Sequence, residues 1–249
     1  MARIKPSMFV GDRFVIQGQE VVVLEYLNRH RVRILFENGY ECFTRVSHIR
    51  DENVRNPLRP SICDVGYKGI GEYDSSNSRK AYQTWVDMLR RCYDLERQKK
   101  HPTYRGCSVE PYWHNFQYFC EWYRDKFTED KIDWVLDKDI LYTGNKVYSR
   151  DTCTPVPESV NSLLTDSKQA RGKCPIGVSW SKGGNKFVAN CQVDGMHIYL
   201  GRFSTATDAF YAYKQFKEDN IKRVAAKWKD KIDPRAYNAL MNYEVEITD

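Results

Sequence analysis

The stretch from Ile176 to Tyr213 constrains the fold most, because three short alternating segments are followed directly by one amphipathic run. The glycine-bearing segment 182–185 and the Asp194-Gly195 pair are typical of hairpin connections and separate the segments into strands. Thr205 followed by Asp208 is typical of a capping box and predicts the start of a helix. The predicted strands are 177–181, 186–193 and 197–203.

The second predicted strand has one apolar and one polar face, because side chains alternate along a strand. The helix carries apolar residues at helical spacing, so it can cover the apolar face. The other face stays open and can enter a groove. The apolar residues are Phe187, Ala189, Cys191 and Val193 on the strand and Ala209, Ala212, Tyr213 and Phe216 on the helix, and the open face carries Asn190, Gln192, His197 and Tyr199.

The same stretch carries a series of short motifs spread over the strands and the start of the helix. They are Gly177-Val178, Lys186-Phe187-Val188-Ala189, Leu200-Gly201-Arg202-Phe203-Ser204-Thr205-Ala206, Asp208-Ala209 and Ala212-Tyr213. The series resembles the Apetala-two/ethylene-response-factor DNA-binding domain. In that family the sheet lies in the DNA major groove, and its open face touches bases and phosphates. The resemblance therefore implies double-stranded DNA as the partner.

The residues that would contact DNA follow from this resemblance. Most of them differ from the arginines and tryptophans of the family, and Asn and Gln favour adenine edges whereas arginine favours guanine. The alternative is a stable sheet-and-helix module with an ordinary polar face. The family's reading positions fall on Ile176, Ser179, Ser181, Asn190, Gln192, His197 and Tyr199, and Lys182 and Lys186 are added as DNA contacts.

Composition bounds the class of protein. The 249 residues are enough for two or three domains, and the net charge of +6 suits a polyanionic partner without requiring one. No apolar run is long enough to cross a bilayer, and the first residues lack the core of a signal peptide, so we expect a cytoplasmic protein without a membrane partner. Eight cysteines without a C-x-x-C pair predict reduced thiols.

The N-terminal fifth of the chain is predicted to be rich in strands. Strand signals at 13–16, 20–27, 31–36 and 40–43 are separated by hairpin turns and predict a small β-barrel of the Src-homology-three or Tudor type. Residues 51–78 contain prolines, glycines and serines with little periodicity, which predicts a linker or an extended strap.

Two helices are predicted next, at 79–97 and 113–127, with aromatic stripes that indicate core packing. Arg90 and Arg91 lie on the polar face of the first helix and are further candidate DNA contacts. After the helices, 134–141 reads as a strand, 144–153 as a glycine-bearing loop and a second strand, and Val156 to Asn161 as a short helix. This order resembles the ββα-metal core of the HNH homing endonucleases, in the divergent form that bacteriophages combine with an Apetala-type domain.

The resemblance implies a specific set of catalytic positions. An HNH enzyme needs a histidine that deprotonates water and ligands that hold one divalent cation against the scissile phosphate. Lys138 or Asp139 stands at the histidine position, and Asp137 matches the acidic residue before it. Asn145 matches the central asparagine that orients the loop, and Thr152 stands where the family often has Asn or His on its short helix.

Two interpretations of this HNH-like core remain open, and the first is a metal centre. Asp137, Asp139 and Asp151 would hold Mg²⁺ or another divalent cation through oxygen ligands, with a metal-bound water as nucleophile. The second interpretation is that the core is an inherited structural scaffold that no longer cuts DNA. A cation near Asp137 and Asp139 would support cleavage, whereas a salt bridge from Lys138 into that space would argue against it.

The sequence thus predicts an α+β protein of the bacterial host cytoplasm. Its function is that of a metal-dependent DNA endonuclease or nickase, or alternatively of a DNA-binding regulator or occluder without catalysis. A protein-binding inhibitor of a host enzyme is a third alternative, because small barrels often bind proteins. The predicted parts are a barrel at 1–50, a linker or strap at 51–78, an HNH-like module with flanking helices at 79–168, an Apetala-two-like domain of three antiparallel strands on one helix at 173–228, and a C-terminal helix with a tail at 229–249.

Overall fold

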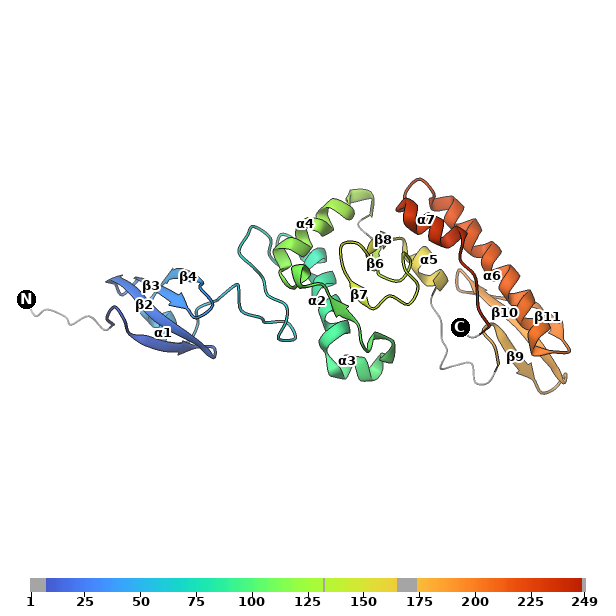
Figure 1. Ribbon diagram of the computed structural model, residues 1–249, viewed down its shortest axis with the longest axis horizontal. Coiled ribbons are helices and arrows are strands. Elements are labelled where there is room, and N and C mark those ends of the chain that lie inside the picture. Colours follow the sequence, from blue (N-terminus) through green and yellow to red (C-terminus); the bar gives the residue numbers. More distant parts are fainter. Residues whose placement is uncertain (1–7, 132, 165–173, 248–249) are drawn as a thin grey trace, which may run out of the picture. The chain divides into compact units, whose positions relative to one another are not determined.

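The computed structural model describes residues 8–131, 133–164 and 174–247, and within them the fold is mixed α+β (Figure 1). The described residues form seven α-helices and four small sheets. Two compact units are formed, one by the chain up to Arg90 with Pro111–Cys120, the other by Arg91–Glu110 with the chain from Glu121 onward. The predicted boundary between the HNH-like module, ending at 168, and the Apetala-like domain, beginning at 173, lies outside the described residues. In the described part of the chain, no helix has both the length and the hydropathy needed to cross a membrane.

The first unit begins with a four-stranded antiparallel meander in the order β1-β2-β3-β4. The predicted strands are confirmed to within a few residues. The turn between the first two strands places both Gln17 and Gly18 at positive φ, 50° and 81°, which matches the twist of tight hairpins. The strands are β1 Arg13–Ile16, β2 Gln19–Asn28, β3 Arg31–Phe36 and β4 Glu41–Thr44.

The predicted barrel is wrong, because this sheet is open. Each strand pairs only with its sequence neighbours, so β1 and β4 remain opposite edges. The apolar face is covered by the short helix α1 (Val46–Arg50) and by Met8 rather than by closure of the sheet on itself. The buried strand residues are Ile16, Val21, Val23, Val32, Ile34 and Phe36.

A buried amide, that of Gln117, holds part of the segment between the meander and the first long helix. Nε2 of Gln117 donates to the carbonyl oxygens of Lys68 and Tyr73, each at 2.9 Å, and its Oε1 accepts from the Tyr73 N–H at 3.0 Å. Gly71 allows this close approach, because a Cβ there would collide with the Gln117 side chain. This part of the strap is therefore fixed against the start of α4.

The helices α2 (Arg79–Tyr93) and α3 (Leu95–Lys100) correct the single helix predicted over 79–97. Asp94 interrupts it: its backbone is extended, and its side chain accepts from the N–H groups of Glu96 and Arg97 as an N-cap. The second predicted helix corresponds to α4 (Phe116–Lys126), preceded by a 3₁₀ turn over Pro111–His114. Further 3₁₀ turns are Pro102–Tyr104, Glu129–Lys131 and Ser162–Leu164.

The second unit contains two small pairs of strands. β5 (Ser108–Val109) runs parallel to β7 (Val147–Tyr148), and β6 (Val135–Asp137) runs antiparallel to β8 (Thr154–Val156). α5 (Glu158–Asn161) follows β8 directly. The antiparallel partner of β6 therefore comes from 154–156 and not from the predicted second strand within 144–153, because Val147 and Tyr148 pair with β5 instead.

The C-terminal sheet has the order β11-β10-β9 and is packed on α6 (Figure 1). The predicted helix start is confirmed, with Thr205 as the N-cap: its Oγ1 accepts from the Asp208 N–H at 3.1 Å and donates to the Asp208 carboxylate at 2.7 Å. Asp233 caps the last helix, which Pro234 opens and which corresponds to the predicted C-terminal helix. The elements are β9 Val178–Ser181, β10 Lys186–Val193, β11 Met196–Phe203, α6 Ala206–Trp228 and α7 Pro234–Met241.

The long helix α6 contributes to two hydrophobic cores. Its N-terminal half, with Ala209, Phe210 and Tyr213, packs on the sheet, and Val245 from the C-terminal tail completes that core. Its C-terminal half joins a second core with α5, β8 and α7. The second core is formed by Ile140, Val156, Val160, Leu163, Ile221, Val224, Ala225, Ile232, Ala236 and Leu240.

Candidate nucleic-acid interface and candidate metal centre

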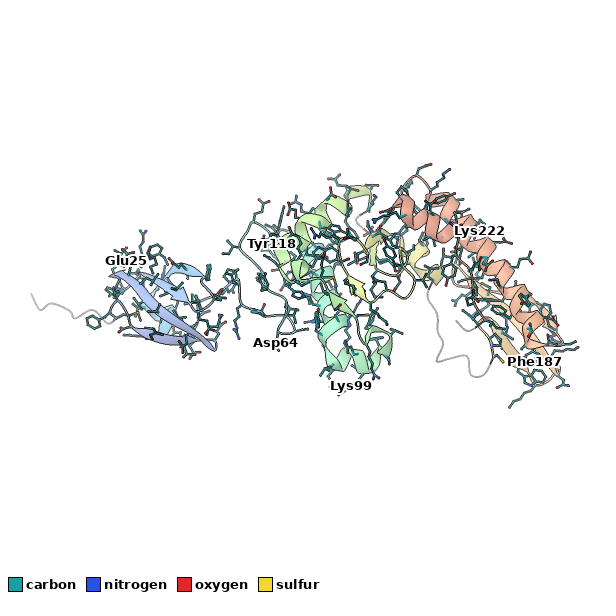
Figure 2. The ribbon with its side chains drawn as sticks, viewed as in Figure 1. Glu25, Asp64, Lys99, Tyr118, Phe187 and Lys222 are labelled. Atoms are coloured by element: carbon teal, nitrogen blue, oxygen red, sulfur yellow. The ribbon has the colours of Figure 1, made fainter. Side chains whose placement is uncertain are left out.

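One face of the β9-β10-β11 sheet is covered by α6 and the other is open. Along β10, Ala189 and Cys191 are buried on the helix side, and the residues between and beside them point the other way. The strand register extends this division to the neighbouring strands. Phe187, which marks this sheet in Figure 2, lies on the helix side next to Trp180.

A β-bulge in β11 decides which residues of that strand reach the open face. Ala189 pairs with Gly201, but Asn190 pairs with Tyr199, so Leu200 is the extra residue and the register shifts at this point. Gly201 adopts φ 135°, which a side chain would make unfavourable. As a result, Tyr199 and His197 share the open face with Arg202, although strict alternation would place Arg202 on the opposite face.

The open face gathers seven predicted DNA contacts and one residue that sequence reasoning missed. Lys186 Nζ lies 2.8 Å from Ser204 Oγ at one end of the face. Tyr199 is 60% exposed although it lies within a strand. Lys182 is exposed in the turn after β9. The register places Ser179, Ser181, Lys186, Asn190, Gln192, His197 and Tyr199 on this face, together with Arg202.

The charge on this face is of one sign. The three strands contain Lys186, Arg202 and His197 but no Asp or Glu, although the chain has 33 acidic residues. Cationic side chains among hydroxyl, amide and phenol groups can donate hydrogen bonds to phosphates and to base edges. The face is therefore chemically suited to a polyanion that also presents hydrogen-bond acceptors.

The two arginines predicted on α2 differ in their surroundings. Arg90 is exposed. Arg91 is half-buried: its guanidinium lies 5.4 Å from the ring centre of Tyr104 and hydrogen-bonds to the Tyr148 hydroxyl. Burial raises the pKa of Tyr148, and the positive charge of Arg91 opposes that shift. Arg91 is thus engaged in the packing of the second unit.

Asp137 ends β6 and caps the turn that follows. Its Oδ1 accepts from the N–H groups of Asp139 at 2.8 Å and Ile140 at 2.6 Å. Burial raises the pKa of Asp137 above its usual value, and these two hydrogen bonds limit the shift. One carboxylate oxygen is therefore committed to the backbone.

The ammonium group of Lys138 fills the space beside this turn. Lys138 is only 6% exposed, and its Nζ lies 2.7 Å and 2.6 Å from the two carboxylate oxygens of Asp139 and 2.7 Å from the carbonyl oxygen of Asn145. The same nitrogen lies 5.8 Å from the ring centre of Tyr148. An ammonium has three N–H bonds, so this arrangement gives each of them an oxygen acceptor.

Asn145 fixes the loop between β6 and β7. Its Nδ2 donates to the carbonyl oxygens of Lys138 at 2.8 Å and Val147 at 2.7 Å, and its Oδ1 accepts from the Val147 N–H at 3.1 Å. Thr152 donates to the same Val147 carbonyl at 2.7 Å and lies in the turn before β8. The short helix α5 begins only at Glu158, so Thr152 does not lie on that helix, which ends with Asn161.

The three predicted metal ligands do not form a site that fits a divalent cation. Asp139 already binds the Lys138 cation with both oxygens, and Asp137 caps backbone N–H groups. Asp151 is exposed, and its backbone oxygen accepts from Arg235. Across residues 8–131, 133–164 and 174–247, no group of three or more His, Cys, Asp or Glu side chains is placed to hold a metal ion. Burial also raises the pKa of the nearby Cys153 thiol to about 12, which keeps it neutral.

No family model, curated protein or solved structure matches this chain. The resemblances to the HNH and Apetala-two families therefore rest on the motifs alone.

Proposed function

We propose that the protein binds double-stranded DNA through the open face of the β9-β10-β11 sheet. The observation that carries the proposal is the division of this sheet: α6 covers one face, and the other exposes cations and amides with no carboxylate in any of the three strands. A polar face without acidic side chains suits a polyanion.

The dimensions of the sheet also suit a major groove. Strand axes lie about 4.8 Å apart, so three strands span roughly 10 Å. The major groove of B-DNA is about 12 Å wide and presents acceptors and donors on every base pair. Lys186 and the turn residue Lys182 are then positioned for phosphates, while the amides of Asn190 and Gln192 face base edges.

We further propose that the β6-β8-α5 core stabilises the fold and does not cut DNA. The ion pair between Lys138 and Asp139 supports this proposal, because a positive charge held at those oxygens repels a divalent cation. A second candidate function, metal-dependent DNA cleavage, is favoured by one observation. β6, β8 and α5 follow one another as a strand pair and a helix, with the carboxyl group of Asp137 at the end of the first strand.

DNA binding is tested by fluorescence anisotropy with a short mixed-sequence duplex over a series of salt concentrations. We expect log K to fall linearly with log salt, because bound phosphates release counterions. Lys186→Ala is expected to reduce the magnitude of that slope by roughly 0.9, the contribution of one phosphate contact. The control is Lys126→Ala, which removes an exposed lysine paired with Asp125 outside the sheet and should leave the slope unchanged. Absence of salt-dependent binding would contradict the proposal.

Cleavage is tested with supercoiled plasmid in the presence of Mg²⁺ or Mn²⁺. We expect the plasmid to be bound and to remain supercoiled. Nicked or linear product that disappears in Asp137→Asn/Asp139→Asn, while that variant still binds DNA, would establish the nuclease function instead. The asparagines retain oxygen acceptors, so this variant is less disruptive to the turn than a change to alanine.

A further inference from the structure

We infer that the N-terminal sheet carries a dimerisation surface, which binds the same surface of a second copy of this chain. The surface is the outer face of the β1-β2-β3-β4 sheet, the side opposite α1 and Met8. Along β2, Val21 and Val23 are buried on the α1 side, so Val22 between them points to the outer face. This face lies outside the proposed DNA-binding sheet, and its role does not depend on DNA binding.

One row of outer-face residues runs straight across all four strands. Arg13 of β1 pairs with Val22 of β2. Val22 pairs in turn with Leu35 of β3, and Leu35 pairs with Glu41 of β4. The row therefore has a cation at one edge of the sheet, two apolar side chains in the middle and a carboxylate at the other edge. Arg13 and Glu41 are three strand spacings apart, roughly 14 Å, so they do not contact each other within one chain.

Apolar side chains form a diagonal stripe on the same face. Val15 on β1 and Phe43 on β4 each lie two residues beyond an end of the row, so alternation places both on the outer face. Val15 is 59% exposed and Phe43 is 48% exposed. Together with Val22 and Leu35, they extend the stripe over all four strands. Such a stripe gains free energy when another apolar surface covers it.

The charges of this sheet are balanced, which distinguishes it from the β9-β10-β11 sheet. Arginines and glutamates are close together on it: Arg13 lies 3.5 Å from Glu20, and Arg33 lies 4.0 Å from Glu25, which is labelled in Figure 2. A face with both signs in equal number does not favour a polyanion or a strongly charged partner, and it can be complementary to itself. The charged residues of the four strands are Arg13, Arg31 and Arg33 with Glu20, Glu25 and Glu41.

A two-fold axis parallel to the strands brings opposite charges of the two copies together. This axis turns one sheet over onto the other and exchanges its edges, so β1 of one copy lies over β4 of the second copy. Arg13 of each copy then faces Glu41 of the other, and the apolar residues in the middle of the row face one another. In the neighbouring row, Glu25 faces Arg33 of the second copy. A two-fold axis perpendicular to the strands instead places Arg13 over Arg13 and Glu41 over Glu41, which is unfavourable.

The size of the sheet limits the affinity of this pairing. A face roughly 14 Å wide buries less than the standard area of about 800 Å² per partner. One like-charged pair, Glu20 and Glu37 of the second copy, meets at the end of the sheet where water screens it. We therefore expect a reversible dimer with a dissociation constant in the micromolar range.

The test is sedimentation velocity of the full chain over a wide range of protein concentration, without DNA. We expect a monomer at low and a dimer at high concentration. Arg13→Glu and Glu41→Arg, each alone, create two like-charged contacts in the symmetric dimer, so each should raise the dissociation constant at least about tenfold. Both positions are exposed, and we expect unchanged circular dichroism and melting temperature. Leu35→Lys should also weaken the dimer, whereas Leu95→Lys, at an exposed leucine on α3, should not.

Mixing the two charge variants in equal amounts tests the arrangement itself. In the mixed dimer, the introduced glutamate at position 13 faces the introduced arginine at position 41, and the native Arg13 and Glu41 face each other at the second contact. We expect the mixture to dimerise with the wild-type dissociation constant to within a few-fold. The two residues lie on opposite edges of one sheet, so contacts within a chain do not produce this recovery.

Weaker dimers of the single variants, with recovery in the mixture, support the inference. A wild type that is monomeric at every concentration overturns it. A dimer that Arg13→Glu or Leu35→Lys leaves unchanged also overturns it, because another surface then holds the copies together. A mixture that dimerises no more tightly than its components excludes the proposed axis and overturns the inference as well. The proposed DNA binding stands or falls separately, because no DNA is present in these measurements.

Discussion

The Nζ atom of Lys138 lies 2.6 Å from Oδ2 and 2.7 Å from Oδ1 of the neighbouring Asp139, so two adjacent residues form an ion pair across their own turn. The lysine side chain is nearly inaccessible, whereas 47% of the Asp139 side chain is exposed. The cation of Lys138 therefore bridges the carboxylate at the surface and the carbonyl of Asn145 in the loop. The Lys138 side chain thus helps to order the loop between β6 and β7.

Replacing Lys138 should destabilise this unit. Lys138→Met leaves the Asp139 carboxylate and the Asn145 carbonyl without their donor, and we expect the free energy of unfolding to fall by about 2 kcal/mol. Asp139→Asn should cost less, and the double variant should show a coupling of about 1 kcal/mol in urea unfolding. The matched surface variant Arg13→Met, which breaks an exposed pair with Glu20, should cost less than about 0.5 kcal/mol. Equal costs for Lys138→Met and Arg13→Met would contradict the assigned role.

The two roles of the Asp137 side chain, hydrogen-bond acceptor and buried charge, can be separated by substitution. Asp137→Ala removes the acceptor of two backbone N–H groups and should lower the free energy of unfolding by about 2 kcal/mol. Asp137→Asn retains an acceptor and removes the buried charge, so it should be neutral or stabilising at pH 7. A loss for Asn as large as that for Ala, measured by urea unfolding, would show that the negative charge itself is needed.

The difference in stability between wild type and Asp137→Asn should depend on pH, and the sign of this dependence follows from the pKa shift of Asp137. Burial raises the pKa of Asp137 in the folded state above the unfolded value near 3.8, so the folded protein binds the proton more tightly. The cost of the charge is present above the folded pKa and disappears as the pH falls below the unfolded value. The stability advantage of Asp137→Asn over wild type should therefore be largest near neutral pH and shrink toward pH 4. An advantage that grows on acidification would contradict the direction of the shift.

The N-cap of α6 should make a measurable contribution to stability. Thr205→Ala removes the acceptor for the Asp208 N–H, and we expect a loss of about 1 kcal/mol. Thr205→Ser retains the hydroxyl and serves as the control, with a loss of a few tenths of a kcal/mol at most. Thermal unfolding followed by circular dichroism distinguishes the two, and similar melting temperatures for Ala and Ser would refute a capping role.

The C-terminal tail should stabilise the sheet. Val245 is 2% exposed in the core under α6, its N–H donates to Glu218 at 2.9 Å, and its carbonyl accepts from Lys214 at 2.8 Å. Val245→Ala leaves the backbone bonds in place and removes two buried carbon atoms, so we expect a loss of about 2 kcal/mol. Ile247→Ala, at a residue that is 44% exposed, should change stability little. If the two changes have equal effects on urea unfolding, the tail does not belong to this core.

Much of the local structure could be predicted because its signals are local. Alternation located β3 and β10 at their observed ends, and the Thr205 cap located the start of α6. The break at Asp94 was missed, because the cap depends on the extended backbone of that residue. Periodicity indicates which side of a helix is apolar, but it does not indicate where one helix ends and the next begins.

The candidate site could be predicted only in part. Alternation correctly separates Asn190 and Gln192 from the apolar face of β10. It fails on β11, where one extra residue reverses the face of everything beyond it, and this is why Arg202 was missed. For Lys138, the sequence left two interpretations open, and the ion pair with Asp139 supports our proposal of a core without a metal, because it occupies oxygens that a metal would need.

The sequence by itself determined the strands of the N-terminal and C-terminal sheets, most of the helices, the Thr205 cap and the apolar faces, since these depend on residues within a few positions of one another. The tertiary structure decided that the N-terminal sheet stays open, that β6 pairs with β8, and that Tyr199, His197 and Arg202 share one face. Those outcomes depend on strand pairing between distant segments. Pairing register is fixed by the packing of whole faces, and a shift of one residue moves every following side chain to the other side of the sheet.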